Sequence, residues 1–160
     1  MNKHLRQYIR QLLITEESNP DLGVVSLFRQ LESQVSSSSV SPYRARFFQN
    51  HADCTVELSV SVDGNKEIWV DKIETFGLNR KTDPNCFRKG YASQMLKLLT
   101  QGADDYGITL TLIAAPEPWQ LRQNPDLPDK DELAKFYSKH GFLETSRNYA
   151  QVYMKRDPDQ

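Results

Sequence analysis

The feature that most constrains the fold is a strictly alternating segment, residues 55–62, that is followed at once by Asp63-Gly64. Alternation of polar and apolar residues is typical of a strand with one buried face. An Asp-Gly pair after such a strand is a strong hairpin signal. We therefore predict that residues 67–76 return beside the first strand, and that a sheet lies at the centre of the molecule.

After this hairpin, the apolar residues no longer recur at every second position but at the spacing typical of a helix. Ala92, Met95, Leu96 and Leu99 fall on one helical face, which predicts a helix over residues 90–106. Gly107 is placed to end this helix. Residues 108–114 follow as an apolar strand. A strand, a helix and a strand in this order form a crossover unit, and such units join parallel strands.

The remaining segments complete one domain, residues 1–160, with a mixed-sheet α/β (α+β) fold. Asp129 and Glu132 have the spacing of a capping box, which predicts the start of a helix. The expected segments are N-terminal helices in residues 1–35, a flexible Ser-rich loop at 36–42, a Pro-rich loop at 116–128, a helix at 129–140 and two short strands that end near 155.

Composition limits the partners and the compartment. The formal net charge of −1 does not favour a nucleic-acid partner, and no apolar segment is long enough to predict a membrane span. The two cysteines, Cys54 and Cys86, make no disulfide framework, so we expect a cytoplasmic protein with reduced thiols. Cys86 is then interpreted as a buried apolar residue. His51 and Cys54 would be half of a metal site, but no second pair follows at a suitable spacing, so no metal is predicted.

The segment from Phe87 to Ala92 lies between a predicted strand and a predicted helix. Unpaired N–H groups at a helix N-terminus attract phosphate, and Gly90 would let the backbone approach an anion closely. Arg88 and Lys89 add positive charge at the same point. A tight turn with solvated basic residues explains the same pattern, and spacing alone leaves both interpretations open.

A second cluster occurs near the end of the late helix. Leu133, Phe136 and Tyr137 share one helical face, so a tyrosine packed in the core is the simpler interpretation of Tyr137.

Taken together, the two clusters resemble the GNAT superfamily of N-acetyltransferases. That family carries Arg/Gln-x-x-Gly-x-Gly/Ala followed by a Phe/Leu-Tyr-x-x-x-Gly-Phe segment, which residues 87–92 and 136–142 match in order. The resemblance covers about residues 55–155 and departs from the family at Phe87 and Lys130. It implies a mostly antiparallel sheet with a splayed parallel strand pair and helices on both faces. It also implies acetyl transfer from acetyl-CoA, as co-substrate, to a primary amine by direct transfer in a ternary complex.

The resemblance also implies roles for individual residues. Tyr137 matches the general acid that protonates the departing thiolate. Glu74 is our candidate general base, with Asp71 and Glu57 as alternatives, and a solvated strand residue is the simpler interpretation of Glu74. The residues that we expect to bind the cofactor, mainly through the main chain, are Phe76, Gly77, Leu78, Phe87, Arg88, Lys89, Gly90, Tyr91 and Ala92.

The acceptor and the oligomeric state are less constrained. The acidic segment 116–132 suggests a cationic amine, either a small molecule or a peptide, although a solvated acidic loop explains it equally well. A homodimer is left open. Two alternatives remain: a catalytically inactive acyl-CoA-binding domain, and a nucleic-acid or protein interaction module that uses the basic and aromatic residues 43–48.

Overall fold

The computed structural model describes residues 22–64, 66–77, 83–116, 121–122 and 125–159. Its centre is a seven-stranded mixed sheet with the strand order β1-β2-β3-β4-β5-β7-β6. The strands are β1 (Ser37–Val40), β2 (Arg44–His51), β3 (Cys54–Val62), β4 (Glu67–Gly77), β5 (Thr109–Ala114), β6 (Leu143–Arg147) and β7 (Val152–Arg156).

The predicted hairpin and crossover are both present. β3 and β4 pair antiparallel across the Asp63-Gly64 turn, where Gly64 has a φ of 70°. A bulge between Ser59 and Val60 shifts their register, so Ser59 faces Lys72 while Val60 faces Val70. β4 and β5 pair parallel, and the crossover helix between them is α3 (Tyr91–Tyr106). Gly107, with a φ of 66°, ends α3 as predicted.

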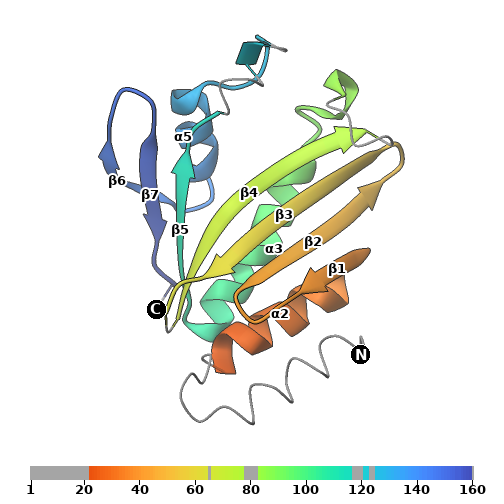
Figure 1. Cartoon of the computed structure of the whole chain (residues 1–160), viewed down its shortest axis with the longest axis vertical. Coiled ribbons are helices and arrows are strands. Elements are labelled where there is room, and N and C mark those ends of the chain that lie inside the picture. Colours follow the sequence, from red (N-terminus) through yellow and green to blue (C-terminus); the bar gives the residue numbers. More distant parts are fainter. Residues whose placement is uncertain (1–21, 65, 78–82, 117–120, 123–124, 160) are drawn as a thin grey trace.

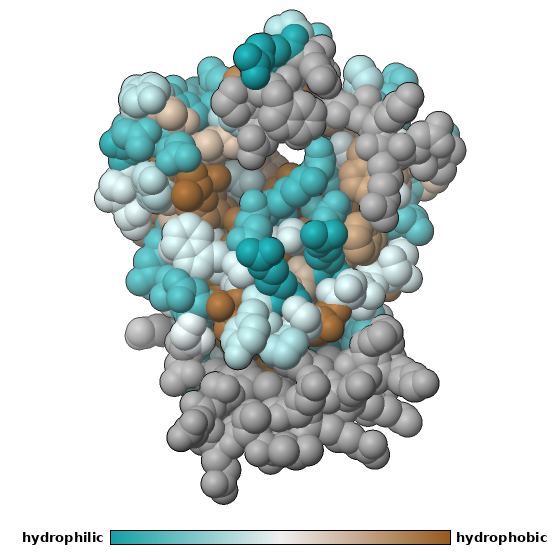
Figure 2. Space-filling model, viewed as in Figure 1, coloured by the Kyte–Doolittle hydropathy of each residue, from teal (hydrophilic) through white to brown (hydrophobic). Residues whose placement is uncertain are grey.

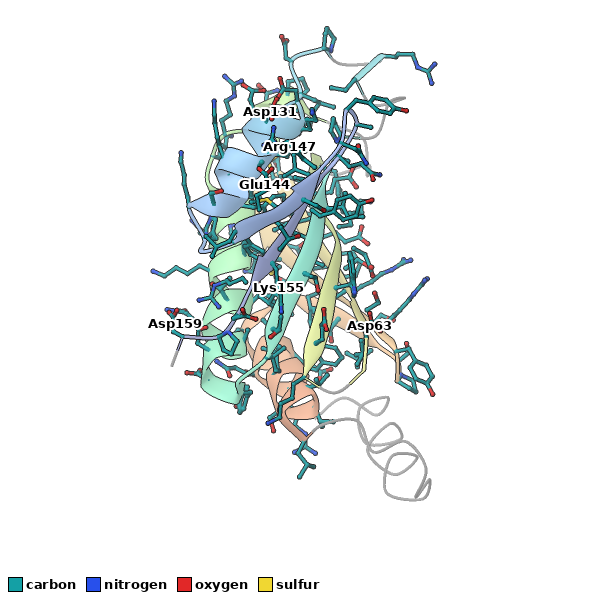
Figure 3. The ribbon with its side chains drawn as sticks, turned by 90° about the vertical axis from the view of Figure 1, so that its left-hand side faces the viewer. Asp63, Asp131, Glu144, Arg147, Lys155 and Asp159 are labelled. Atoms are coloured by element: carbon teal, nitrogen blue, oxygen red, sulfur yellow. A yellow bond between two sulfur atoms is a disulfide. The ribbon has the colours of Figure 1, made fainter. Side chains whose placement is uncertain are left out.

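The described helices lie on one face of the sheet, as Figures 1 and 3 show. They are α2 (Leu22–Gln34), α3 and α5 (Lys130–Ser138), and a short 3-10 helix, η1 (Pro84–Cys86), precedes α3. The expectation of helices on both faces is therefore wrong for the part of the chain that the structure describes. The physical reason is that the buried residues of β3, β5 and β7 all point to one side, and only that side needs a cover.

The helices bury a continuous apolar core against that face. Phe28 of α2 packs edge-on to Phe47 of β2, with ring centroids 5.8 Å apart. Gly102 lets α2 and α3 approach closely, because a Cβ at this position would lie 2.4 Å from Cδ1 of Leu27. The predicted capping box forms at the start of α5, where Asp129 accepts from the N–H of Glu132 and the Glu132 side chain accepts from the N–H of Asp129.

Two strands near the N-terminus were not predicted. The Ser-rich segment 36–42 was expected to be a flexible loop, but residues 37–40 of it form β1, paired antiparallel with β2. β1 forms because β2 presents unpaired backbone groups at the edge of the sheet, which serine can satisfy as well as any other residue. The first expected helix lies in residues 1–21, outside the described residues, and α2 confirms the second.

The cysteines also differ from the expectation. Cys54 and Cys86 form a disulfide across 32 residues, so neither is a free thiol and Cys86 is more than an apolar filler. The sequence did not indicate this pairing, because the two residues meet only once η1 folds back onto the start of β3. In the described part of the chain no helix has the length and apolar character needed to cross a membrane.

Candidate functional site

The predicted phosphate-binding turn leads directly into α3. Arg88 and Gly90 both have left-handed backbones, with φ values of 58° and 78°. A Cβ at Gly90 would meet nothing within 4 Å, so the turn is open on that side. Among the described residues no side chain caps α3, and its first backbone hydrogen bond runs from the N–H of Gln94 to the carbonyl of Gly90. The N–H groups of the first turn are therefore available to an anion.

Both ends of this turn are attached to the β2–β3 hairpin. Upstream, Cys86 is bonded to Cys54, the first residue of β3. Downstream, the ring of Tyr91 stacks on His51, the last residue of β2, with centroids 4.1 Å apart and planes within 7°. The half-site for a metal that His51 and Cys54 suggested is thus used for two different contacts, which hold the Gly90 turn in place.

Beside the turn, β4 and β5 separate. Their parallel pairing runs from Glu67 with Thr109 to Val70 with Leu112, and the described register contains no pair beyond it. β4 nevertheless continues to Gly77, so its last residues run away from β5, and Figure 1 shows the two strands diverging. The predicted splayed pair is present.

The residues predicted to contact the cofactor arm lie at the far end of β4. Phe76 and Gly77 are buried, and Leu78 lies outside the described residues. Gly77 packs closely against Asp83, since a Cβ at Gly77 would lie 3.0 Å from the Asp83 Cβ. Phe87 and Ala92 are half-buried, whereas Arg88 and Lys89 are exposed beside the turn.

The candidate base lies on the face of the sheet that no described helix covers. Glu74 of β4 faces Glu57 of β3 directly, and Lys72 forms an ion pair with Glu74 and lies 3.9 Å from Glu57. Arg46 of β2 lies 3.8 Å from Glu57 on the other side. Figure 2 shows mainly hydrophilic residues over the middle of this face. The alternative base Asp71 is exposed and accepts a hydrogen bond of 2.8 Å from Ser61.

The candidate acid lies on the other face. Tyr137 of α5 is only 8% exposed and packs edge-on against the rings of Phe136 and Phe142. Burial raises the pKa of its hydroxyl to about 12, so the phenol stays protonated at any physiological pH. Tyr137 and Glu74 therefore approach the sheet from opposite sides.

A contact that the sequence did not reveal joins the two clusters. Ser93 Oγ, in the first turn of α3, lies 2.7 Å from Nε2 of His140, just after α5. Burial, assisted by the charge of Lys139, lowers the pKa of His140 below its ordinary value, which favours a neutral imidazole. The two residues are 47 positions apart, and only the packing of α3 beside the end of α5 brings them together.

The orientation of α5 is fixed from its other side as well. Arg147 of β6 lies 2.9 Å from Asp131, in the first turn of α5, and 2.6 Å from Glu144 (Figure 3). The hydrogen bonds of Arg147 lower the pKa of Glu144. Because both ends of α5 are held, the position of Tyr137 relative to β5 is held too.

A scan against protein-family models finds no match to this chain. A search of curated proteins likewise finds no relative.

Proposed function

We propose that this protein is an acetyl-CoA-dependent N-acetyltransferase that transfers an acetyl group to a primary amine directly, within a ternary complex. The observation that carries the proposal is the separation of β4 and β5 after Val70 and Leu112, next to the open Gly90 turn at the start of α3. The resemblance of residues 87–92 and 136–142 to the GNAT superfamily supports it.

The cofactor diphosphate would lie on the N–H groups of the first turn of α3. Gly90 leaves room for it, and Arg88 and Lys89 supply positive charge beside it. The pantetheine arm would then follow the part of β4 beyond Val70, on the side that faces β5, as an added strand bound by main-chain hydrogen bonds. In this position the thioester lies between the diverging strands, and backbone N–H groups of β4 stabilise the oxyanion of the tetrahedral intermediate.

Proton transfers at the two faces complete the reaction. An amine with a pKa of about 10 is mostly protonated at neutral pH and must lose a proton before it attacks the thioester. Glu74 accepts that proton, directly or through water, and Lys72 orients its carboxylate. When the intermediate collapses, the hydroxyl of Tyr137 donates a proton to the departing thiolate. The raised pKa of Tyr137 keeps this proton in place until the thiolate forms.

The acceptor that we favour is a cationic amine. Asp129, Asp131 and Glu132 place negative charge at the start of α5. Part of this charge already has a structural role, because Asp129 and Glu132 form the capping box and Asp131 pairs with Arg147. The preference for a cationic acceptor therefore rests on the combined electrostatic field of the charged residues at this end of the molecule.

The test is release of free thiol from acetyl-CoA in the presence of polyamines, aminoglycosides and peptide amines. The proposal predicts thiol release that depends on the acceptor and is fastest with cationic amines. Binding of acetyl-CoA without any acceptor-dependent turnover would instead favour the inactive acyl-CoA-binding domain. Salt-sensitive binding of oligonucleotides, without binding of acetyl-CoA, would favour the interaction module.

A further inference from the structure

The two attachments of the Gly90 turn connect it to two residues of the sheet that lie opposite each other on neighbouring strands. His51 and Cys54 are register partners across the β2–β3 hairpin. The disulfide links Cys54 to Cys86, four residues before Gly90, and the ring stack links His51 to Tyr91, directly after Gly90. The segment from Cys86 to Tyr91 is therefore attached at both ends to the same pair of sheet residues.

The upstream end depends on the disulfide more than on other contacts. In the described part of the chain the backbone N–H groups of η1 bond locally: those of Asn85 and Cys86 donate to Asp83, each at 2.9 Å. These bonds shape η1 but do not connect it to the sheet. The contact of Asp83 with Gly77 supports the beginning of η1, whereas the disulfide holds its end, where the Gly90 turn begins.

The two attachments also differ in chemistry. The stack of His51 on Tyr91 is non-covalent and does not respond to thiols. The sulfur–sulfur bond can be broken by a dithiol: two electrons and two protons pass to Cys54 and Cys86, and the dithiol leaves as its own disulfide. Reduction would thus release the Cys86 end of this segment from the sheet and leave the Tyr91 end attached.

We propose that the Cys54–Cys86 disulfide is a redox switch that sets the affinity of the Gly90 turn for the diphosphate of the cofactor. This proposal rests on the function proposed above. With the disulfide formed, residues 86–91 are held in the conformation that binds the anion. With the disulfide reduced, the turn samples more conformations, and binding must then supply the free energy needed to order it.

The experiment is calorimetric titration of the full chain with desulfo-coenzyme A, which has no thiol to exchange with the protein. The titration is done on the oxidised protein, after reduction with dithiothreitol, and after reoxidation. We expect the dissociation constant to rise about tenfold on reduction, which corresponds to ordering roughly one additional residue on binding. Reoxidation should restore the original value.

Two controls separate the switch from a general loss of structure. A variant with both Cys54→Ser and Cys86→Ser should bind as weakly as the reduced protein and should not respond to dithiothreitol. Amide hydrogen exchange should increase on reduction in residues 83–91 and remain unchanged in α5. If the double variant does not fold, the reduced wild-type protein and its exchange pattern still decide the question.

The outcomes are distinguishable. Equal affinity of the oxidised and reduced proteins, with two thiols titrated after reduction, overturns the switch and leaves the acetyltransferase proposal standing. Two free thiols in the protein after exposure to a disulfide oxidant also overturn the switch. Failure of both forms to bind desulfo-coenzyme A contradicts the proposed function, and the switch fails with it.

Discussion

The hydroxyl of Ser93 lies 2.7 Å from Nε2 of His140, and this contact connects the first turn of α3 to the end of α5. The carbonyl of His140 also accepts a hydrogen bond of 3.0 Å from Nε of Arg156, at the end of β7. A single residue therefore connects the helix that starts at the Gly90 turn, the helix that carries Tyr137 and the central sheet. The relative position of the two predicted site clusters depends on His140.

The lowered pKa of His140 predicts a pH dependence of stability. Because the folded state favours the neutral imidazole, stability is fully present above the ordinary histidine pKa of 6.5. It should fall as the pH drops below 6.5 and level off below the folded-state pKa. Urea unfolding between pH 5 and pH 8 measures this trend, and a His140→Gln variant should show a smaller slope. An equal slope in the variant would assign the pH dependence to other groups.

The pair formed by Asp104 and Arg156 predicts a second pH effect at lower pH. Arg156 donates to both carboxylate oxygens of Asp104, at 2.6 and 2.7 Å, and this hydrogen bonding is the main cause of the lowered pKa of Asp104. The stabilisation is present above the unfolded-state pKa and is lost as the pH falls through the folded-state pKa.

An Asp104→Asn variant tests that pair by leaving Arg156 without its carboxylate. We expect the variant to be about 2 kcal/mol less stable at pH 7, because Arg156 is only 8% exposed. The difference from the wild-type protein should vanish at low pH, where Asp104 is protonated in both folded and unfolded chains. A difference that persists unchanged at low pH would show that the charge of Asp104 is not responsible.

The parts of the fold that were predicted are those determined by nearby residues. Asp63-Gly64 defines a hairpin turn, Gly107 ends α3, and Asp129 with Glu132 caps α5. Each of these signals acts within four residues, so the sequence alone reveals it.

The parts that were not predicted depend on contacts between distant residues. β2 contains the adjacent Phe47 and Phe48, which obscure its alternation, and β1 forms only because β2 offers it an edge. The disulfide joins residues that are 32 positions apart, and the Ser93–His140 contact spans 47. Pairings of this kind require the completed sheet, so no local pattern indicates them.

The role proposed for Tyr137 is tested by a Tyr137→Phe variant. Loss of the hydroxyl should lower kcat about a hundredfold, which is typical of losing a general acid, and should leave the affinity for acetyl-CoA nearly unchanged. Since the pKa of Tyr137 is about 12, its ionisation should not limit the rate in the wild-type protein below pH 11. Tyr149→Phe is the matched control, because Tyr149 is 95% exposed. Equal kcat values for the two variants would exclude Tyr137 as the acid.

The role proposed for Glu74 is tested against its cross-strand neighbour. Glu74→Gln keeps the shape of the side chain but removes the proton acceptor, so kcat should fall about a hundredfold. Glu57→Gln changes the same charge next to the same lysine, Lys72, and should have a much smaller effect. The measurement is thiol release at a saturating acceptor concentration. If the Glu57 variant loses more activity than the Glu74 variant, the base has been assigned to the wrong strand.

The most direct test of the central claim compares two glycines that both have a positive φ. Gly90 has a φ of 78° and Gly64 a φ of 70°, and a Cβ at either would meet nothing within 4 Å. Valine strains the backbone similarly at both positions, but only Gly90 lies at the proposed diphosphate site. Calorimetric titration with acetyl-CoA should show at least tenfold weaker binding for Gly90→Val and unchanged binding for Gly64→Val. Equal affinity of the Gly90→Val variant and the wild-type protein would contradict the proposed site.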